Sequence, residues 1–361
     1  MSAVRIAALR KKARSENLDG VIITRRDRIR YLCGYTGSNG LLVITAKTAL
    51  FLTDFRYSDQ SKKEVKGARV NVMDKGDLIA CLTKFPQLNQ KNVKYGYSNS
   101  HLSVADRDRM QAALPEALLV PADKLLSNLG WVKDKKEVEL IARAVEIGDT
   151  AFERVLNLIQ PGVREREIAA ELEYQMKMLG SSKPAFDSIV ASGYRSALPH
   201  GEASSKKIKK GEFITFDFGA VYKGYVSDMT RTVVCGKATA RQKKIYNLVL
   251  KAQKAGIRKV RAGVMAKAVD DVCRKIITRA GYGKNFGHGT GHGIGVFYDP
   301  IHTGPRVAAV SEDKLMVNNV ITIEPGIYIS GWGGVRIEDD VVVTSTGARV
   351  LNRAPKNLLE L

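Results

Sequence analysis

Four carboxylates in the second half of the sequence occur in two segments of similar layout. The first, FITFDFGAVYKGYVSDMTRTVV, holds Asp217 and Asp228, and the second, VITIEPGIYISGWGGVRIEDDVVV, holds Glu324 and Glu338. Each segment has the apolar pattern of a strand, a turn and a second strand, with an acid on each strand. A carboxylate among apolar neighbours is costly unless it is paired or bound to a metal. A surface turn or an arginine partner could explain any one acid, but the matched set predicts a site for cations.

A glycine-rich stretch, GHGTGHGIG at residues 287–295, contributes two of the five histidines. Its glycine spacing matches neither a P-loop nor a dinucleotide fingerprint, which disfavours phosphate binding. The pair His288 and His292, four residues apart, suggests one metal ligand and one substrate contact. Four carboxylates and one imidazole suit two divalent ions of the manganese, cobalt or zinc kind. Two such ions can activate water for hydrolysis of an amide bond.

The elements that carry these residues are duplicated. Gly162 precedes an amphipathic segment that stops at Gly180, and Gly263 precedes another that stops at Gly281, so both intervals are 18 residues. The offset between the halves is 101 at the first glycines, 107 for Asp217 to Glu324 and 110 for Asp228 to Glu338. A duplicated α+β unit with pseudo-twofold symmetry follows.

The first 125 residues alternate helix-like and strand-like segments, the pattern of an α/β domain. We predict a helix over Ile6–Glu16 and a hairpin over Leu41–Asp54. Asp134 and Glu137 form a capping box that opens a long helix reaching about Gln160. We place the domain boundary near residue 128, which gives an N-terminal α/β domain over 1–128 and a catalytic α+β domain over 129–361.

The chain is strongly basic, with 58 Lys and Arg against 37 Asp and Glu, a net charge of +21. No zinc finger, RNP motif or basic helix accompanies this charge, so we expect a solvated basic surface and no nucleic-acid partner. No apolar run is long enough to span a membrane, and the first twenty residues do not resemble a signal peptide. The four cysteines are far apart and predict reduced core thiols, which favours a cytoplasmic location.

The motifs resemble the creatinase, prolidase and methionine aminopeptidase superfamily, the pita-bread metallopeptidases, over essentially the whole chain. The resemblance implies a creatinase-like N-terminal domain and a pita-bread catalytic domain. It also implies a metal-ligand set in the family's order, from FDFG, SDMTRT, HGTGHGIG, TIEPG and GGVRIED: Asp217, Asp228, His292, Glu324 and Glu338. By this resemblance Asp228 and Glu338 bridge two metals, and Glu324 is also the general acid and base for a bridging hydroxide.

Further residues carry over to the substrate side of the site. SGYRSALPHG is similar to the family's motif that places His200 near the scissile carbonyl, and His288 is similar to the histidine that flanks the substrate. His302 takes the third histidine's role if IHTGPRV aligns with the family's IHEAPRV, three residues later than usual. Arg336 resembles the arginine that braces a metal-ligating carboxylate, and Arg306 is a candidate for binding the substrate carboxylate.

The resemblance narrows the activity to the Xaa-Pro branch. TGSNG at residues 36–40 and TDFRYSDQ at residues 53–60 are similar to the N-terminal domain of aminopeptidase P and prolidase. We therefore expect an exopeptidase for proline-containing peptides, with Xaa-Pro aminopeptidase slightly favoured over Xaa-Pro dipeptidase, Mn²⁺ favoured over Co²⁺ or Zn²⁺, and a homodimer. The alternatives are a methionine aminopeptidase and a non-enzymatic basic protein that binds nucleic acid or another protein.

Overall fold

The computed structural model describes residues 2–74, 76–296 and 304–361. The chain divides into two compact units, residues 1–129 and 130–361. Each has its own hydrophobic core, so each is described by itself.

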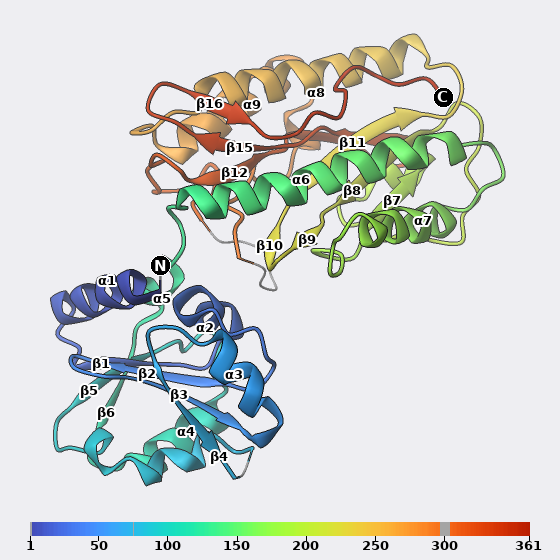
Figure 1. Ribbon diagram of the computed structural model, residues 1–361. Helices are drawn as coiled ribbons and strands as arrows, with labels where there is room; N and C mark the ends of the chain where they lie inside the picture. The colour runs from blue at the N-terminus through green and yellow to red at the C-terminus, as the bar shows by residue number, and fades with distance from the viewer. Residues whose placement is uncertain (1, 75, 297–303) are drawn as a thin grey trace. The chain divides into compact units, whose positions relative to one another are not determined.

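The first unit is built on a six-stranded sheet with the order β4-β3-β2-β1-β5-β6. Its strands are β1 (Gly20–Ile23), β2 (Leu41–Thr45), β3 (Ala49–Asp54), β4 (Arg69–Met73), β5 (Lys94–Tyr97) and β6 (Leu118–Pro121). Its helices are α1 (Ser2–Ser15), α2 (Arg26–Cys33), α3 (Ser58–Glu64), α4 (Val104–Ala113) and α5 (Asp123–Ser127). The predicted hairpin is β2 and β3, which pair antiparallel. One core lies under α1 and α2 and a second under α4, on opposite faces of the sheet (Figure 1).

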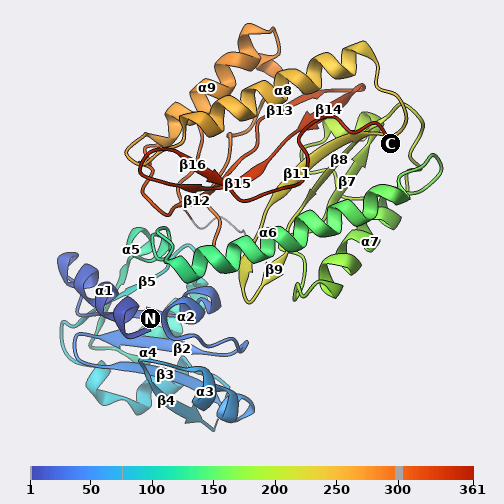
Figure 2. The ribbon, with the colours of Figure 1, turned by 45° about the horizontal axis from the view of Figure 1, so that its top comes forward.

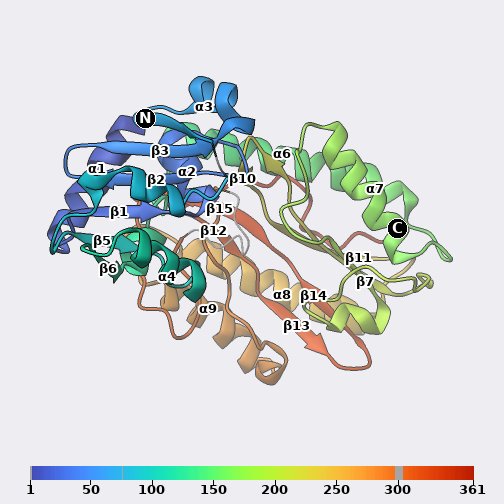
Figure 3. The same cartoon turned by 90° about the horizontal axis from the view of Figure 1, so that it is seen from below.

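The second unit repeats one arrangement of helices and strands. The first half holds α6 (Lys135–Val155), α7 (Glu165–Met178), β7 (Ile189–Ser192), β8 (Phe213–Phe218), β9 (Val221–Tyr222), β10 (Tyr225–Val226) and β11 (Met229–Val234). The second half holds α8 (Ala240–Lys259), α9 (Ala266–Arg279), β12 (Val320–Ile323), β13 (Gly326–Ile329), β14 (Gly333–Arg336), β15 (Asp339–Val343) and β16 (Ala348–Val350). In both halves a helix pair precedes the strands, as the duplication predicts. Figures 2 and 3 show the strands between the pairs α6/α7 and α8/α9.

Capping boxes fix where two of the long helices begin. Asp134 accepts from the Glu137 backbone N–H while the Glu137 side chain accepts from the Asp134 backbone, which confirms the predicted start of α6. Thr239 and Gln242 do the same for α8. Helix α6 ends earlier than the predicted end near Gln160. Its last α-helical residue is Val155, and it continues only as a 3₁₀ turn over Leu156–Leu158. A 3₁₀ turn is a common way for a helix to end, since it satisfies some of the last carbonyls.

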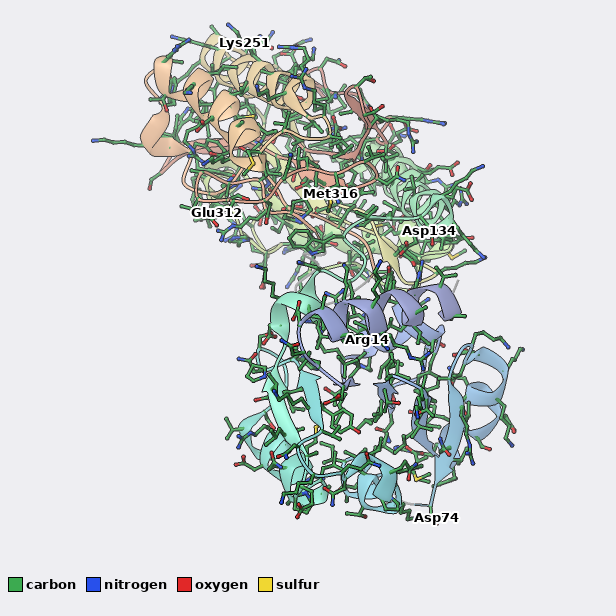
Figure 4. The ribbon with its side chains drawn as sticks, turned by 90° about the vertical axis from the view of Figure 1, so that its left-hand side faces the viewer. Arg14, Asp74, Asp134, Lys251, Glu312 and Met316 are labelled. Carbon is green, nitrogen blue, oxygen red and sulfur yellow. The ribbon has the colours of Figure 1, made fainter. Side chains whose placement is uncertain are left out.

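Part of the basic charge lies on helix α8. α8 carries seven basic residues and no acidic one. Lys251, labelled in Figure 4, is exposed on this helix.

Among the described residues no helix is long and apolar enough to cross a membrane. The predicted core thiols are confirmed, because Cys33, Cys81, Cys235 and Cys273 are all buried and free.

Candidate metal centre

The first pair of carboxylates lies on the hairpin of β8 and β11. In β8 the side chains alternate, so Ile214, Phe216 and Phe218 pack into one core while Phe213 packs into another. Asp217 lies opposite Thr230 of β11 in the antiparallel register. Asp228 directly precedes β11 and is only 4% exposed. The pairing of the two strands therefore brings both carboxylates to one end of the hairpin.

The second pair lies where strands end. Glu324 follows the last residue of β12, and Glu338 lies between β14 and β15, directly before β15, which pairs with β12. The sequence predicted an acid on each of two strands, and this is wrong for Asp228, Glu324 and Glu338, which all lie just outside the ladder. The second segment also forms four strands in two sheets, β12 with β15 and β13 with β14. Pro325 explains the break between β12 and β13, because proline has no backbone N–H to donate to a strand ladder.

The two halves bring the five predicted ligands together. Ligand atoms of Asp217, Asp228 and Glu338 all lie within 4.8 Å of one another. The His292 Nε2 lies 3.4 Å from Asp228 Oδ2 and 3.6 Å from Glu324 Oε1. One imidazole thus stands beside carboxylates from both halves, which is the donor set that the sequence predicts for two divalent ions.

The electrostatics of this cluster favour bound cations. Burial raises the pKa of Asp228 well above its ordinary value, and the neighbouring Asp217 and Glu324 raise it further. Burial and the same kind of repulsion, first from Asp228, raise the pKa of Glu338 well above its ordinary value. The pKa of Asp217 is also raised by burial, although Arg336 opposes the shift. Carboxylates this close in a dry site repel one another unless protons or metal ions compensate them, so the residues fit a divalent metal centre.

Arg336 joins the carboxylates to the substrate side. This buried guanidinium donates to Asp217, to Thr230 Oγ1 at 3.0 Å and to the Tyr328 hydroxyl at 2.7 Å. Thr230 in turn donates to Glu338 Oε2 at 2.7 Å. The Tyr328 hydroxyl lies 2.8 Å from His288 Nε2. Arg336 therefore holds ligands from both halves and, through Tyr328, the imidazole of His288.

Burial sets the protonation of this second set of groups. It lowers the pKa of His288, which favours the neutral imidazole near pH 7. It raises the pKa of Tyr328 to about 12, so the phenol keeps its proton. Because His288 Nδ1 lies 2.7 Å from the Gly289 carbonyl oxygen, which can only accept, a neutral His288 carries its proton on Nδ1 and its Nε2 accepts from the Tyr328 hydroxyl.

Sequence reasoning missed three residues of the centre. Thr230 and Tyr328 supply the hydroxyls just described, and Asp340 accepts from the Asp228 backbone N–H at 2.9 Å. Asp340 is 0% exposed, and burial raises its pKa well above the ordinary value. Its Oδ1 has no hydrogen-bond partner among the described residues. The sequence signal that could have identified Thr230 and Asp340 is their position, because each lies two residues from a predicted ligand.

The remaining predicted site residues are His200, Arg306 and His302. His200 is exposed, and a positive charge on its ring would lower the pKa of Asp217. The Arg306 side chain is exposed, while its backbone N–H donates to Asp313 at 2.8 Å. His302 lies outside the described residues, so its predicted role stays a prediction.

Comparisons with known proteins agree with this geometry. Residues 139–345 match metallopeptidase family M24, and residues 5–129 match the creatinase/prolidase N-terminal domain. The chain is 38% identical to the Xaa-Pro dipeptidase of Pyrococcus horikoshii, over 95% of each sequence.

Solved structures also resemble the chain over nearly its whole length. An Xaa-Pro dipeptidase from Bacillus anthracis has a TM-score of 0.95 at 40% identity and covers 100% of both chains. An X-Pro aminopeptidase from Thermotoga maritima has a TM-score of 0.88 at 37% identity, covering 96% of this chain and 99% of its own. The predicted fold, a creatinase-like domain followed by a pita-bread domain, is confirmed. The chain belongs to metallopeptidase family M24 and is a metallopeptidase with a creatinase/prolidase N-terminal domain.

Proposed function

We propose that this metallopeptidase is a dinuclear exopeptidase that hydrolyses the bond before proline. The observation that carries the proposal is the cluster of Asp217, Asp228 and Glu338 within 4.8 Å, with His292 beside it. Asp217, Asp228, Glu324 and Glu338 would supply oxygen ligands and His292 a nitrogen ligand. When bound, two divalent ions would acidify a water molecule and polarise the scissile carbonyl. Mn²⁺ suits this oxygen-rich set best, with Co²⁺ and Zn²⁺ as alternatives.

The protein's own side chains supply orientation and proton transfer. Glu324 accepts from Thr322 Oγ1 at 3.1 Å, which orients a carboxylate that is 17% exposed and can therefore reach a substrate. This carboxylate takes a proton from the attacking water and returns it to the leaving amine. His288 flanks the substrate in this proposal, with its ring held through Nδ1 by the Gly289 carbonyl at 2.7 Å and through Nε2 by the Tyr328 hydroxyl at 2.8 Å. His200, His302 and Arg306 complete the substrate side in this proposal.

Two forms of the activity differ in the length of substrate. The named relatives include Xaa-Pro dipeptidases at 37–38% identity and an X-Pro aminopeptidase structure at 37% identity. These names support the dipeptidase, in place of the aminopeptidase that the sequence slightly favoured. The homodimer and the cytoplasmic location stay predictions. A non-enzymatic binding protein is disfavoured because all five ligand positions are retained.

Hydrolysis of Ala-Pro, Ala-Pro-Ala and Met-Ala-Ser with added Mn²⁺, Co²⁺ or Zn²⁺ tests the proposal. Cleavage of Ala-Pro alone identifies a dipeptidase, and cleavage of Ala-Pro-Ala identifies an aminopeptidase. The control Glu324→Ala should lose activity by a factor of about 10² or more, as expected for removal of a general base. Cleavage of Met-Ala-Ser alone, or of no peptide, would contradict the proposal.

A further inference from the structure

Two buried carboxylates outside the metal cluster hold the segments that carry His200 and His288, two histidines that are not predicted metal ligands. Glu165 is the first residue of α7, and Asp270 lies one turn inside α9. Both side chains are 0% exposed, and each is paired with an arginine, at 3.0 Å and 2.9 Å. A buried charge with this many partners fixes the groups around it, since each bond is stronger in a dry environment.

Glu165 holds both ends of the segment that carries His200. Its Oε1 accepts from the Ser192 N–H at 2.7 Å and from the Ser192 hydroxyl at 2.8 Å. Its Oε2 accepts from Arg195 Nε at 3.0 Å, from the Ser204 N–H at 3.1 Å and from the Ser204 hydroxyl at 2.6 Å. Arg195 also donates to a backbone carbonyl inside the segment, at 2.5 Å. One carboxylate therefore closes the segment 192–204 into a loop of fixed ends.

Asp270 does the same for the segment that carries His288. Its Oδ1 accepts from the Thr290 N–H at 3.0 Å and from the Thr290 hydroxyl at 2.9 Å. Both of its oxygens accept from Arg274, at 2.9 Å and 3.0 Å. Arg274 extends the hold by donating to the carbonyls of Phe286 at 2.9 Å and His288 at 2.8 Å.

The two arrangements share their chemistry but not their positions. In each, one carboxylate oxygen accepts the N–H and O–H of a single hydroxyl residue, and an arginine donates both to the carboxylate and to carbonyls of the same segment. Glu165 opens its helix whereas Asp270 is interior to its own, so the two are not strict symmetry mates. The two halves of the unit thus use similar clamps for two different histidine segments.

We propose that Glu165 and Asp270 are positioning residues of the hydrolytic site, Glu165 for His200 and Asp270 for His288. The inference rests on the proposed function, in which both imidazoles contact the substrate. Among the described residues the His200 ring makes no hydrogen bond, so its position depends on the backbone that Glu165 holds. The His288 ring is also bonded to Tyr328, so it depends less on Asp270.

The first test is Glu165→Gln, which keeps the shape of the side chain but turns one acceptor into a donor facing other donors. We expect kcat/KM for Ala-Pro to fall by about 10- to 100-fold, as for a misplaced catalytic contact, with metal content unchanged. Glu360→Gln is the control, because Glu360 is a half-buried glutamate of the same unit that accepts from the Ala238 N–H at 2.6 Å and pairs with Lys243 at 3.2 Å. We expect this control to retain kcat/KM.

Coupling to the histidine separates positioning from general loss of stability. In a His200→Ala background, Glu165→Gln should lower kcat/KM by no more than about 2-fold, because residues that act through one another are not additive. An equal loss in both backgrounds would overturn the assignment. If Glu165→Gln does not fold, Ser204→Ala replaces it, because this variant removes only one hydroxyl donor to Glu165. It should lower kcat/KM less than Glu165→Gln, and this loss should likewise nearly vanish in the His200→Ala background.

Asp270→Asn is tested in the same way against His288→Ala. We expect a smaller loss than for Glu165→Gln, since Tyr328 still holds the His288 ring. The Thr290 carbonyl also accepts from the Glu324 N–H at 2.7 Å, so metal content is measured beside activity. A loss of activity that follows loss of metal alone would overturn the assignment for Asp270.

A substrate-free measurement separates this inference from the proposed function. Amide hydrogen exchange over residues 193–204 should be at least about tenfold faster in Glu165→Gln than in the unsubstituted protein, because the ends of the segment are released. Glu360→Gln should leave these amides unchanged. If the unsubstituted protein cleaves no peptide, the proposed function fails. The exchange rates still show whether Glu165 fixes the segment 192–204. Unchanged exchange in Glu165→Gln would overturn this inference.

Discussion

Tyr328 links a substrate-side histidine to the metal ligands through one hydroxyl. The hydroxyl accepts from Arg336 at 2.7 Å and lies 2.8 Å from His288 Nε2. Tyr328→Phe removes both bonds while keeping the ring, and a hydrogen bond to a charged group contributes about 1.5–3 kcal/mol. We therefore expect kcat/KM to fall by about tenfold or more, measured on Ala-Pro with saturating metal.

The control for this variant is another buried tyrosine of the same unit. Tyr246 donates to the Lys356 carbonyl at 3.0 Å. Tyr246→Phe should cost about 0.5–1.5 kcal/mol of stability and leave kcat/KM unchanged. Equal activity losses in the two variants would show that Tyr328 has only a structural role.

A second residue-scale prediction concerns the metal-free protein. Because the pKa of Asp228 is raised on folding, its ionisation opposes folding at pH 7. The unfolded chain releases this proton first as pH rises above the ordinary value near 3.9, so the contribution to stability falls with rising pH until the raised pKa is passed. Asp228→Asn should therefore stabilise the metal-free protein at pH 7 by about 1–3 kcal/mol, while it weakens metal binding.

Thermal unfolding in EDTA checks this prediction. The Tm of Asp228→Asn should exceed that of the unsubstituted protein at pH 7, and the difference should shrink towards pH 4. A lower Tm for Asp228→Asn at pH 7 would mean that the carboxylates do not repel one another in the metal-free site.

At the scale of elements, the hairpin of β8 and β11 depends on a close approach after β8. A Cβ placed on Gly219 would lie 1.9 Å from the Ser227 carbonyl oxygen. Ser227 directly precedes the predicted ligand Asp228, and Asp217 lies two residues before Gly219. The glycine thus lets the chain return closely enough to bring these carboxylates together.

Gly219→Ala should disturb both folding and the site. The added methyl group would collide with the backbone carbonyl of Ser227, which can move only at a cost in free energy. We therefore expect a loss of about 1–3 kcal/mol of stability and a metal affinity lowered by about tenfold or more. Thermal unfolding and titration calorimetry with Mn²⁺ measure the two effects. Gly347→Ala is the control, because a Cβ there meets nothing within 4 Å. Unchanged metal affinity in Gly219→Ala would contradict this view of the hairpin.

At the scale of the whole molecule, the ligands all belong to one unit. The two units, residues 1–129 and 130–361, each have their own core, and the five predicted ligands lie in the second. A ligand that binds only the folded state stabilises by about 2.7 kcal/mol at 100 times its dissociation constant. Removing metal should therefore lower the stability of residues 130–361 and leave that of residues 1–129 unchanged.

Hydrogen exchange with and without EDTA measures this difference unit by unit. Slowly exchanging amides of β8 and β11 should become faster without metal, while those of β2 and β3 should not. An equal change in both units would show that their unfolding is coupled. A metal that protects neither unit would contradict the site itself.

The sequence by itself determined the family, the fold class and much of the local structure. Five predicted metal ligands of three residue types, two matching intervals of 18 residues and a capping box at Asp134 are all legible along the chain. They are legible because helix caps, strand alternation and buried acids leave local signals in the residues that form them. The predicted hairpin of β2 and β3 and the predicted start of α6 follow from the same signals.

Only the tertiary structure decided which side chains meet across the two halves. Thr230 reaches Glu338 and Asp340 reaches the backbone of Asp228, over separations of 108 and 112 residues. No local pattern encodes such contacts, because they depend on how two sheets pack and where their strands end. For the same reason the sequence missed Tyr328 and the clamps at Glu165 and Asp270: each is an ordinary residue in its own segment and gains its role only from a partner brought close by folding.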